Sequence, residues 1–339
     1  MSLFGRDLIT TQEWSVDEIG SVLKLARDFK KKYRVGGIPA LLEGKNFFMV
    51  FYGSSTRTRA AFEAGMALLG GHAAFIDTST TRIGAGEAVK DVARMYERYG
   101  HGIGIRILDE AIDYRYGVGL GTVREFARHA DVPVINMACC TYHPTQGLAD
   151  LMTVEEKLGG IQGKKYAVMW GYSGRFRGRC SIQEEVLVMT RFGMDVVLAH
   201  PPGFELDPRI VGQAGENAAD SGGGFEVTAD YESALRGAHV VFPRNWASAA
   251  LMEAGASGFG EEREAALHER HRDWTLTEDL SDLMDRDGVV THVLPVFRGE
   301  EATDEVMDGP RSVIYDQAEN GLYTKMAVLA LTLGEPAPL

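Results

Sequence analysis

A short run of hydroxyl and cationic residues, Ser55 to Thr58, lies between an apolar stretch at 46–52 and a segment at 60–69 with helical spacing. A strand that ends in small hydroxyl residues before a helix leaves backbone N–H groups at the helix N-terminus, and these groups bind anions. The guanidinium of Arg57 adds donors whose fork geometry matches a phosphate. An ordinary helix N-cap followed by a solvated arginine explains the four residues about as well. Other segments of the sequence are therefore needed to distinguish a phosphate site from an ordinary N-cap.

A second polar group, His143-Pro-Thr-Gln146, follows an apolar stretch at 132–136 and precedes a helical pattern that ends near Leu158. Proline and threonine suit a helix start, so His143 lies where a strand-end loop meets a helix. A lone histidine in such a place is more often structural than catalytic. Arg106 ends the apolar stretch 101–106, and an arginine at a strand end is often only solvated.

Length and charge limit the class of protein. A chain of 339 residues is sufficient for two domains, each with its own core. No apolar run approaches the length of a membrane span, and the N-terminus has no signal-peptide pattern, so we expect a cytoplasmic protein without a membrane partner. The net charge of −13 argues against binding to nucleic acid. An anionic ligand must therefore be bound by a local cluster of arginines.

The sequence predicts neither a metal site nor a cofactor. The three cysteines, Cys139, Cys140 and Cys180, lack the spacing of a zinc or redox motif, so we expect buried free thiols. The glycines at 117–121 superficially suggest a dinucleotide loop. No apolar strand leads into them, and no acidic residue closes a following strand, so the dinucleotide fingerprint is absent.

Apolar stretches alternate with helical patterns along the chain, which predicts an α/β fold of two doubly wound domains, each with a parallel sheet. We expect residues 1–150 to form one domain and 151–339 the other, with glycines at 159–163 marking the boundary region. A final helix at 318–333 is expected to pack back onto the first domain. The strands expected in the second half are 165–170, 195–199, 225–228, 240–242, 289–292 and 312–315.

Three segments occur together in one order: Ser55 to Thr58, a loop that ends in Gly84-Ala-Gly-Glu87, and His143 to Gln146 followed by Leu148-Ala-Asp150. Together they resemble the aspartate/ornithine carbamoyltransferase superfamily, and the match continues in register along almost the whole chain. The resemblance implies that carbamoyl phosphate is bound at its phosphate. The residues that the resemblance implies for binding carbamoyl phosphate are Ser55, Thr56, Arg57, Thr58 and Arg82.

The resemblance also implies a homotrimer. In the superfamily the loop that corresponds to 77–87 reaches across a subunit interface into the neighbouring site. Thr80, Thr81 and Arg82 are the residues that would be supplied in this way.

Carbamoyl transfer requires a phosphate site, donors on the carbamoyl oxygen and an unprotonated amine. The superfamily has an arginine at the position of Arg106 that contacts the carbamoyl carbonyl, and we expect Arg106, His143 and Gln146 to act as catalytic donors there. Each donor aimed at the developing oxyanion typically contributes about 3 kcal/mol. No cysteine or serine has a recognisable base partner, so we expect no covalent enzyme intermediate.

The second half departs from the best-known members of the superfamily. Thr291-His-Val-Leu-Pro295 matches neither the His-Cys-Leu-Pro of ornithine enzymes nor the His-Pro-Leu-Pro of aspartate enzymes. Met169 to Tyr172 and Pro243-Arg-Asn-Trp246 are more similar to the N-acetylornithine and ureidoglycolate types, in which a long loop threads the second domain into a trefoil knot. The ureidoglycolate type implies purine catabolism, the others amino-acid metabolism. The ending Asp316 to Gly321 is instead more similar to the ornithine and aspartate enzymes.

Ligands of open α/β sheets bind beyond the carboxyl ends of the strands, and several arginines lie on such loops in the second half. Arg244 and Arg298 in particular predict a small amine or amide substrate that bears at least one carboxylate. The residues expected on the amine side are Trp170, Arg244, Trp246, His292, Leu294, Pro295 and Arg298.

Three alternatives stay open. The first is ornithine carbamoyltransferase proper. The second is a catalytically silent relative that binds an anion, and the third is an oxidoreductase on a similar scaffold. The joint presence of Arg57, Arg106, His143 and Gln146 argues against the silent relative. The missing glycine fingerprint argues against the oxidoreductase.

Overall fold

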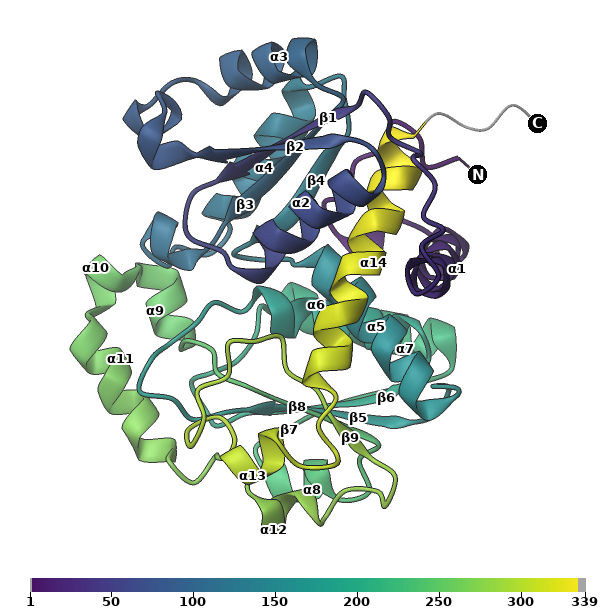
Figure 1. The fold of residues 1–339 in the computed structure, drawn as a ribbon. Coiled ribbons are helices and arrows are strands. Elements are labelled where there is room, and N and C mark those ends of the chain that lie inside the picture. The colour runs from purple at the N-terminus through teal and green to yellow at the C-terminus, as the bar shows by residue number, and fades with distance from the viewer. Residues whose placement is uncertain (1, 335–339) are drawn as a thin grey trace. The chain divides into compact units, whose positions relative to one another are not determined.

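The computed structural model describes residues 2–334, and these form two compact units (Figure 1). Unit 1 contains the chain up to Ile112, then Gly117 to Ala149, and then Ala318 onward. Unit 2 contains Asp113 to Tyr116 and Asp150 to Gln317. Each unit is built around one parallel sheet, as the alternating pattern of the sequence predicts.

Unit 1 has a four-stranded sheet in the order β2-β1-β3-β4. Its strands are β1 (Asn46–Phe51), β2 (His72–Asp77), β3 (Gly102–Ile107) and β4 (Val134–Cys139). All neighbouring pairs are parallel, and β1, β3 and β4 are mainly buried, because helices that connect parallel strands cover the faces of the sheet. The helices of this unit are α1 (Val16–Tyr33), α2 (Arg57–Leu68), α3 (Val89–Tyr99) and α4 (Val118–His129), with the first turns of α5 (Pro144–Leu158) and most of α14 (Ile314–Leu333).

Local sequence explains how two of these helices begin and end. Ser15 and Glu18 form a capping box at the start of α1. Helix α2 ends at Leu68 with Leu69 as its C-cap, and the next residue, Gly70, has a φ of +81° in the left-handed region that favours glycine. A Cβ there would also lie 2.9 Å from the Cβ of Ala40, so only glycine fits the turn into β2.

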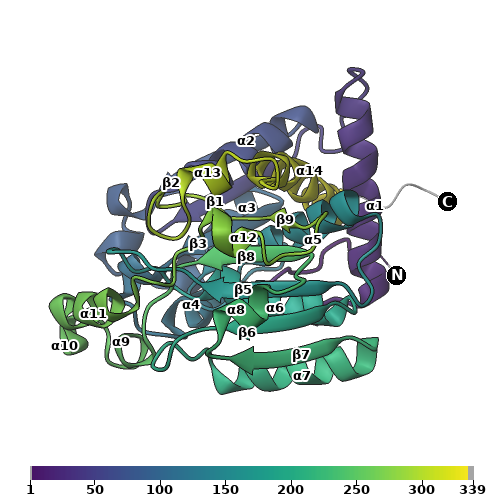
Figure 2. The same cartoon turned by 90° about the horizontal axis from the view of Figure 1, so that it is seen from below.

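Unit 2 has a five-stranded parallel sheet in the order β7-β6-β5-β8-β9, and β7 lies with α7 at one edge (Figure 2). Its strands are β5 (Lys165–Trp170), β6 (Asp195–Ala199), β7 (Gly224–Thr228), β8 (Val240–Arg244) and β9 (Val289–Val290). The larger helices are α6 (Cys180–Arg191), α7 (Pro208–Ser221) and α11 (Glu261–His268), with shorter ones at α8 (Tyr231–Leu235), α9 (Ala249–Ala254), α10 (Ala256–Phe259), α12 (Glu278–Ser281) and α13 (Asp304–Met307).

One predicted strand is wrong. Residues 312–315 do not form a strand, because Ser312 makes only an isolated bridge to Val290 and helix α14 already begins at Ile314. The strand expected at 289–292 is limited to Val289 and Val290. The other strands expected in this half are present within one or two residues of their predicted ends.

Candidate functional site

The strand order of unit 1 reverses between β1 and β3. From β1 the chain proceeds to β2 on one side, and from β3 it proceeds to β4 on the other. Such a switch point opens a crevice at the carboxyl ends of the two strands. Phe51, the last residue of β1, pairs in register with Arg106, so the segment Ser55 to Thr58 and Arg106 follow from neighbouring strand ends.

The start of α2 is an open helix N-terminus. Thr56 occupies the cap position, but no side chain makes a capping hydrogen bond there, so the ordinary N-cap considered from the sequence is not formed. The side chains of Thr56 and Arg57 are exposed, whereas Thr58 is buried and its hydroxyl accepts a hydrogen bond of 3.3 Å from Arg106 Nη1. Uncapped N–H groups and the helix dipole attract an anion to this turn.

A register shift between β3 and β4 affects the direction in which the side chain of Arg106 points. The register between β3 and β4 shifts at this residue, because Ile105 pairs with Asn136 and Arg106 pairs with Ala138, which leaves Met137 without a counterpart. Bulges of this kind change the direction in which neighbouring side chains point. The backbone stays attached to β1, since the Tyr52 N–H donates to the Arg106 carbonyl at 2.9 Å.

His143 is buried at the start of α5, where its carbonyl accepts the Gln146 N–H at 2.9 Å. Burial, reinforced by the charges of Arg106 and Lys325, holds the pKa of His143 well below its usual value. The imidazole is therefore neutral at pH 7. Its Nδ1 atom has no hydrogen-bond partner within residues 2–334, and a neutral imidazole with one such nitrogen can donate to a carbonyl oxygen. Gln146 is half-buried one turn into the same helix.

Lys325 is a charged residue near this group that the sequence reasoning did not select. It lies on α14, is buried, and donates from Nζ to the Gly321 carbonyl at 3.0 Å. The charge of Lys325 contributes to the low pKa of His143, so α14 places a cation near the same strand ends. The indication available in the sequence was a single lysine within the apolar pattern of this helix.

The loop after β2 forms two short 3-10 turns, Thr78–Thr80 and Ile83–Ala85. Asp77 caps the first turn, and the side chain of Ile83 is buried and anchors the second. Thr80 and Arg82 are exposed, and Thr81 is half-buried. The loop therefore presents Arg82 on the surface of unit 1, and its predicted contribution to a neighbouring subunit stays a prediction.

The thiols are free and buried, as expected. Cys140 directly follows β4 and lies against the first turn of α4, which begins at the glycine segment that superficially suggested a dinucleotide loop. A hydrogen bond from Cys139 and backbone N–H groups of α4 lower the pKa of Cys140 to about 6, although burial opposes the shift. Because this sulfur is enclosed, it is not a nucleophile presented to a ligand.

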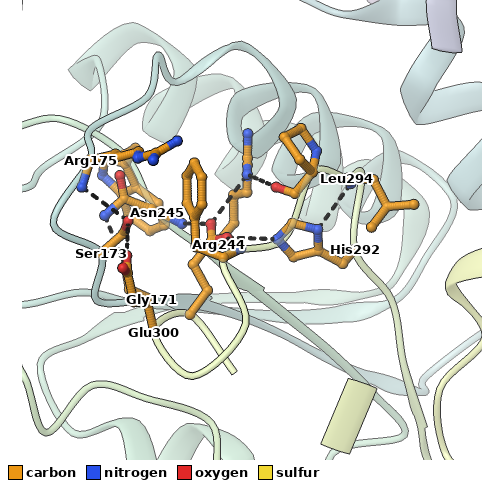
Figure 3. Close-up of polar contacts among 12 residues, drawn as sticks. Gly171, Ser173, Arg175, Arg244, Asn245, His292, Leu294 and Glu300 are labelled. Atoms are coloured by element: carbon orange, nitrogen blue, oxygen red, sulfur yellow. Dashed lines mark hydrogen bonds and ion pairs between the residues drawn. The ribbon is translucent and has the colours of Figure 1, made fainter. Parts of the chain in front are cut away.

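In unit 2 the strand order reverses between β5 and β8, and the ends of these strands form the second polar group (Figure 3). Trp170 and Arg244, the last residues of β5 and β8, pair in register. The loop after β5 is attached to the turn at 297–301, because Glu300 accepts hydrogen bonds from Ser173 Oγ at 2.5 Å and from the Gly174 N–H at 3.0 Å.

Glu301 is the centre of this second group. Its buried carboxylate accepts from Arg244 Nη1 at 3.1 Å and from the backbone N–H groups of Asn245 and Phe297 at 2.8 Å each. His292 Nε2 lies 3.4 Å away. Burial alone would raise the pKa of Glu301, but the charges of His292 and Arg244 lower it to about 2. The carboxylate is therefore ionised at neutral pH.

The two arginines predicted to receive a substrate carboxylate already bind carboxylates of this chain. Arg244 pairs with Glu301, and Arg298 pairs with Asp304 and Asp308 at 2.8 and 2.6 Å, which raises the pKa of Arg298. Arg175 differs from both. Its guanidinium lies 5.1 Å from the ring centroid of Phe297, its side chain is exposed, and it forms no ion pair within the described residues.

The remaining residues expected on the amine side divide into two groups. Trp170 and Trp246 are fully buried, and their indole N–H groups donate to the backbone of Trp246 and Phe204, so they support the strand ends from inside. His292, Leu294 and Pro295 form the loop after β9, in which His292 Nδ1 accepts the Leu294 N–H at 2.9 Å. Leu294 has a φ of +53°, which is unusual for a branched residue and marks a constrained position.

Among residues 2–334, no cluster of three His, Cys, Asp or Glu side chains could hold a metal ion. Within the same range, no helix is long and apolar enough to cross a membrane.

Comparison with known proteins gives matches along nearly the whole chain. The family model for the aspartate/ornithine carbamoyltransferase carbamoyl-P binding domain matches residues 6–156, and the model for the Asp/Orn binding domain matches residues 163–332. The anabolic ornithine carbamoyltransferase of Pyrococcus furiosus is 39% identical over 335 residues, which cover 98% of each chain.

Two solved structures give a similar result. The ornithine carbamoyltransferase from Pyrococcus furiosus has a TM-score of 0.86 at 37% identity and covers 98% of both chains. An acetylornithine transcarbamylase complexed with acetylcitrulline has a TM-score of 0.89 at 31% identity and covers 97% of this chain and all of that one. Sequence identity is thus higher to the first protein, whereas backbone similarity is slightly higher to the second.

Proposed function

The chain belongs to the aspartate/ornithine carbamoyltransferase family and is a carbamoyltransferase, and we propose that it carbamoylates an amino or amide group of a small molecule that bears a carboxylate. Carbamoyl phosphate is the donor and phosphate is released. The observation that carries this proposal is the uncapped N-terminus of α2 beside Arg106 and the neutral His143. In this proposal unit 1 binds the donor and unit 2 binds the amine.

The phosphate binds to the first turn of α2, with Ser55, Thr56 and Thr58 as hydroxyl donors and Arg57 as the counter-charge. Arg106, His143 and Gln146 donate to the carbamoyl oxygen. The amine attacks the carbamoyl carbon, a C–N bond forms, and negative charge develops on that oxygen. The C–O bond to phosphate then breaks, and a proton passes from the nitrogen to the departing phosphate. Stabilisation of the oxyanion is the largest contribution expected from this chain.

We propose Arg175 as the receptor of the substrate carboxylate. It is supported by its position on the loop after β5, its exposed guanidinium and its lack of an ion pair within the described residues. Arg244 and Arg298 hold Glu301 and the pair Asp304 and Asp308, so substrate would have to displace a protein carboxylate to reach them. In this proposal Arg244 positions the site instead of contacting the substrate.

Ornithine is the second candidate substrate, because relatives at 36–39% identity are named ornithine carbamoyltransferases. The departure at Val293 and the segment Pro243 to Trp246 favour another amine. A panel of ornithine, N-acetylornithine, an amide that bears a carboxylate, and putrescine, each with carbamoyl phosphate and read as phosphate release, separates these possibilities. Turnover of a carboxylate-bearing member is expected, and efficient turnover of putrescine alone would contradict the proposal.

The role of Arg175 has its own test. Arg175→Gln is expected to raise the KM for the amine about tenfold, the typical effect of losing one charge-assisted hydrogen bond, with little change in the KM for carbamoyl phosphate. Arg175→Lys keeps the charge and is expected to recover part of the loss. Unchanged amine kinetics in Arg175→Gln would exclude this arginine as the receptor.

We also propose a homotrimer with shared sites, because the exposed Arg82 lies on the loop that resembles the loop donated in trans by the superfamily. Mixing inactive Arg57→Ala subunits with inactive Arg82→Ala subunits should restore part of the activity. Verified mixed oligomers without activity would contradict shared sites.

A trefoil knot in unit 2 is a further proposal. The loop after β5 and the segment after β8 are hydrogen-bonded to each other, with the Ala247 N–H donating to the Arg177 carbonyl at 2.8 Å. An experimental structure in which the chain trace closes without a knot would refute it.

A further inference from the structure

Unit 2 contains a buried group of acidic residues that the proposed mechanism does not use. Asp150 on α5, and Glu184 and Glu185 on α6, have no exposed surface. Carboxylates so deeply buried are rare unless they are paired or neutralised. Helix α6 is buried on nearly all sides, so these residues are not solvated members of a polar helix face.

The contacts of Glu185 explain how its buried carboxyl group is stabilised. Its Oε2 accepts a hydrogen bond of 3.0 Å from the Tyr166 hydroxyl on β5, whereas its Oε1 is buried and has no hydrogen-bond donor within residues 2–334. The carboxyl group of Asp150 is close enough to act on Glu185, and two carboxyl groups can share a hydrogen bond only if one of them carries a proton. Burial, followed by the negative charge of Asp150, holds the pKa of Glu185 well above its usual value. The proton therefore belongs to this pair at neutral pH.

The pair is connected to the loop after β9 by two routes. Gln317 donates from Nε2 to Asp150 Oδ1 at 2.5 Å, and its Oε1 accepts the backbone N–H of His292 at 2.8 Å. On the other side, the Tyr166 hydroxyl lies 3.5 Å from Thr291 Oγ1. Both routes end at the residues that lead into His292-Val-Leu-Pro295, whose backbone is constrained at Leu294.

We propose that Glu185 is a positioning residue that stays protonated, donates a hydrogen bond to Asp150, and through Gln317 fixes the backbone at His292 on the amine side of the site. This inference rests on the proposed function, because it assigns the network to the amine substrate and not to carbamoyl phosphate. An amide at this position reproduces the donor, whereas removal of the side chain breaks the route through Asp150.

The network also predicts a pH dependence of stability. The titratable groups that face Glu185 are Asp150 on α5, Tyr166 on β5 and Glu184 on α6. Because the pKa of Glu185 is higher in the folded chain than in the unfolded chain, the folded chain binds more protons between these two values. The free energy of unfolding therefore falls as pH rises through this interval, and the slope disappears in Glu185→Gln.

The kinetic test compares Glu185→Gln, Glu185→Ala and Gln317→Ala with Thr190→Val. Thr190 is a matched control, because it is buried on α6 and its hydroxyl bonds only within its own helix. Glu185→Ala and Gln317→Ala are expected to raise the amine KM by roughly tenfold, the effect of about one lost buried hydrogen bond. Glu185→Gln and Thr190→Val should keep it within about twofold of the unaltered chain. Carbamoyl-phosphate affinity should be unchanged in all four.

Two outcomes would overturn the proposal: an unchanged amine KM in folded Glu185→Ala, or a Glu185→Gln variant as impaired as Glu185→Ala. Infrared spectroscopy gives a readout that needs no substrate, since the unaltered chain should show a buried carboxylic-acid C=O band that Glu185→Gln lacks. Absence of that band at pH 7 refutes the protonated state, even if Glu185→Ala does not fold. Presence of the band in a chain that turns over no amine would instead count against the proposed function.

Discussion

The polar groups at the two strand switch points differ in what surrounds them. In unit 1 the hydroxyl of Thr56 and the guanidinium of Arg57 are exposed at a helix N-terminus that no side chain caps. In unit 2 Arg244 and His292 are buried against Glu301, a carboxylate of the same chain. The same type of strand switch point thus presents donors in one unit and encloses an ion-pair network in the other.

This difference indicates that the polar group of unit 1 binds a ligand, whereas the polar group around Glu301 in unit 2 holds the strand ends in place. Exposed donors on a helix start can bind a phosphate with little rearrangement, because the dipole and the backbone are already oriented. A buried carboxylate that accepts three hydrogen bonds fixes the strand ends instead, since removing it leaves the buried charge of Arg244 without compensation. Charge-altering substitutions should therefore affect ligand binding at the start of α2 and stability at Glu301.

Glu301→Ala should give the largest change in stability. It leaves Arg244 and two backbone N–H groups buried without their acceptor, and breaking such a pair typically destabilises by about 3–5 kcal/mol. Urea unfolding followed by circular dichroism measures the change. If Glu301→Ala keeps the stability of the unaltered chain, the contrast between the two units is wrong.

The same carboxylate predicts a response to acid. Its pKa is about 2 in the folded chain against an ordinary value of 4.5, so its stabilisation is complete above pH 4.5 and is lost as pH falls toward 2. The loss amounts to roughly 3 kcal/mol. Acid titration of the unaltered chain and of Glu301→Gln should show this difference, and parallel acid transitions would contradict it.

His143→Ala should lower kcat by about 100-fold, the effect of removing one donor from a developing oxyanion. The Kd for carbamoyl phosphate should change much less, because the proposed role belongs to the transition state. Since the pKa of His143 is well below its usual value, activity should not fall as pH decreases from 7.5 to about 6.5 through protonation of this group. Equal losses in kcat and phosphate binding would indicate a structural histidine.

Arg298→Ala should have the smallest effect and serves as the control for Glu301→Ala. Its ion pairs with Asp304 and Asp308 are substantially exposed, and surface pairs contribute about 1 kcal/mol or less. Thermal unfolding that shows a loss comparable to Glu301→Ala would mean that exposure does not explain the contrast.

Much of the architecture was predictable because it depends on local periodicity. Apolar stretches followed by helical patterns predicted both parallel sheets. The predicted strand at 312–315 was wrong for a physical reason. Ser312 makes only one isolated β-bridge, and helix α14 begins two residues later at Ile314. Periodicity cannot decide such short apolar segments.

The site was less predictable where charges pair across long distances in the chain. Arg244 and Arg298 were recognised as cations at strand ends, but their partners Glu301 and Asp308 could only be assigned once the loops were placed. The influence of Asp150 on α5 on the buried Glu185 on α6 likewise could only be assigned once both helices were placed. Residue type and spacing predict where charges occur, and tertiary contacts decide whether those charges face a ligand or each other.

The central claim is that the start of α2 in unit 1 binds carbamoyl phosphate. Calorimetric titration of carbamoyl phosphate into the unaltered chain and into Arg57→Ala, without any amine, tests it most directly. Loss of a charge-assisted contact to phosphate should weaken binding by about 10- to 100-fold. The free energy of unfolding should stay within about 0.5 kcal/mol, because the side chain is exposed. Undiminished binding by a folded Arg57→Ala variant would contradict the account.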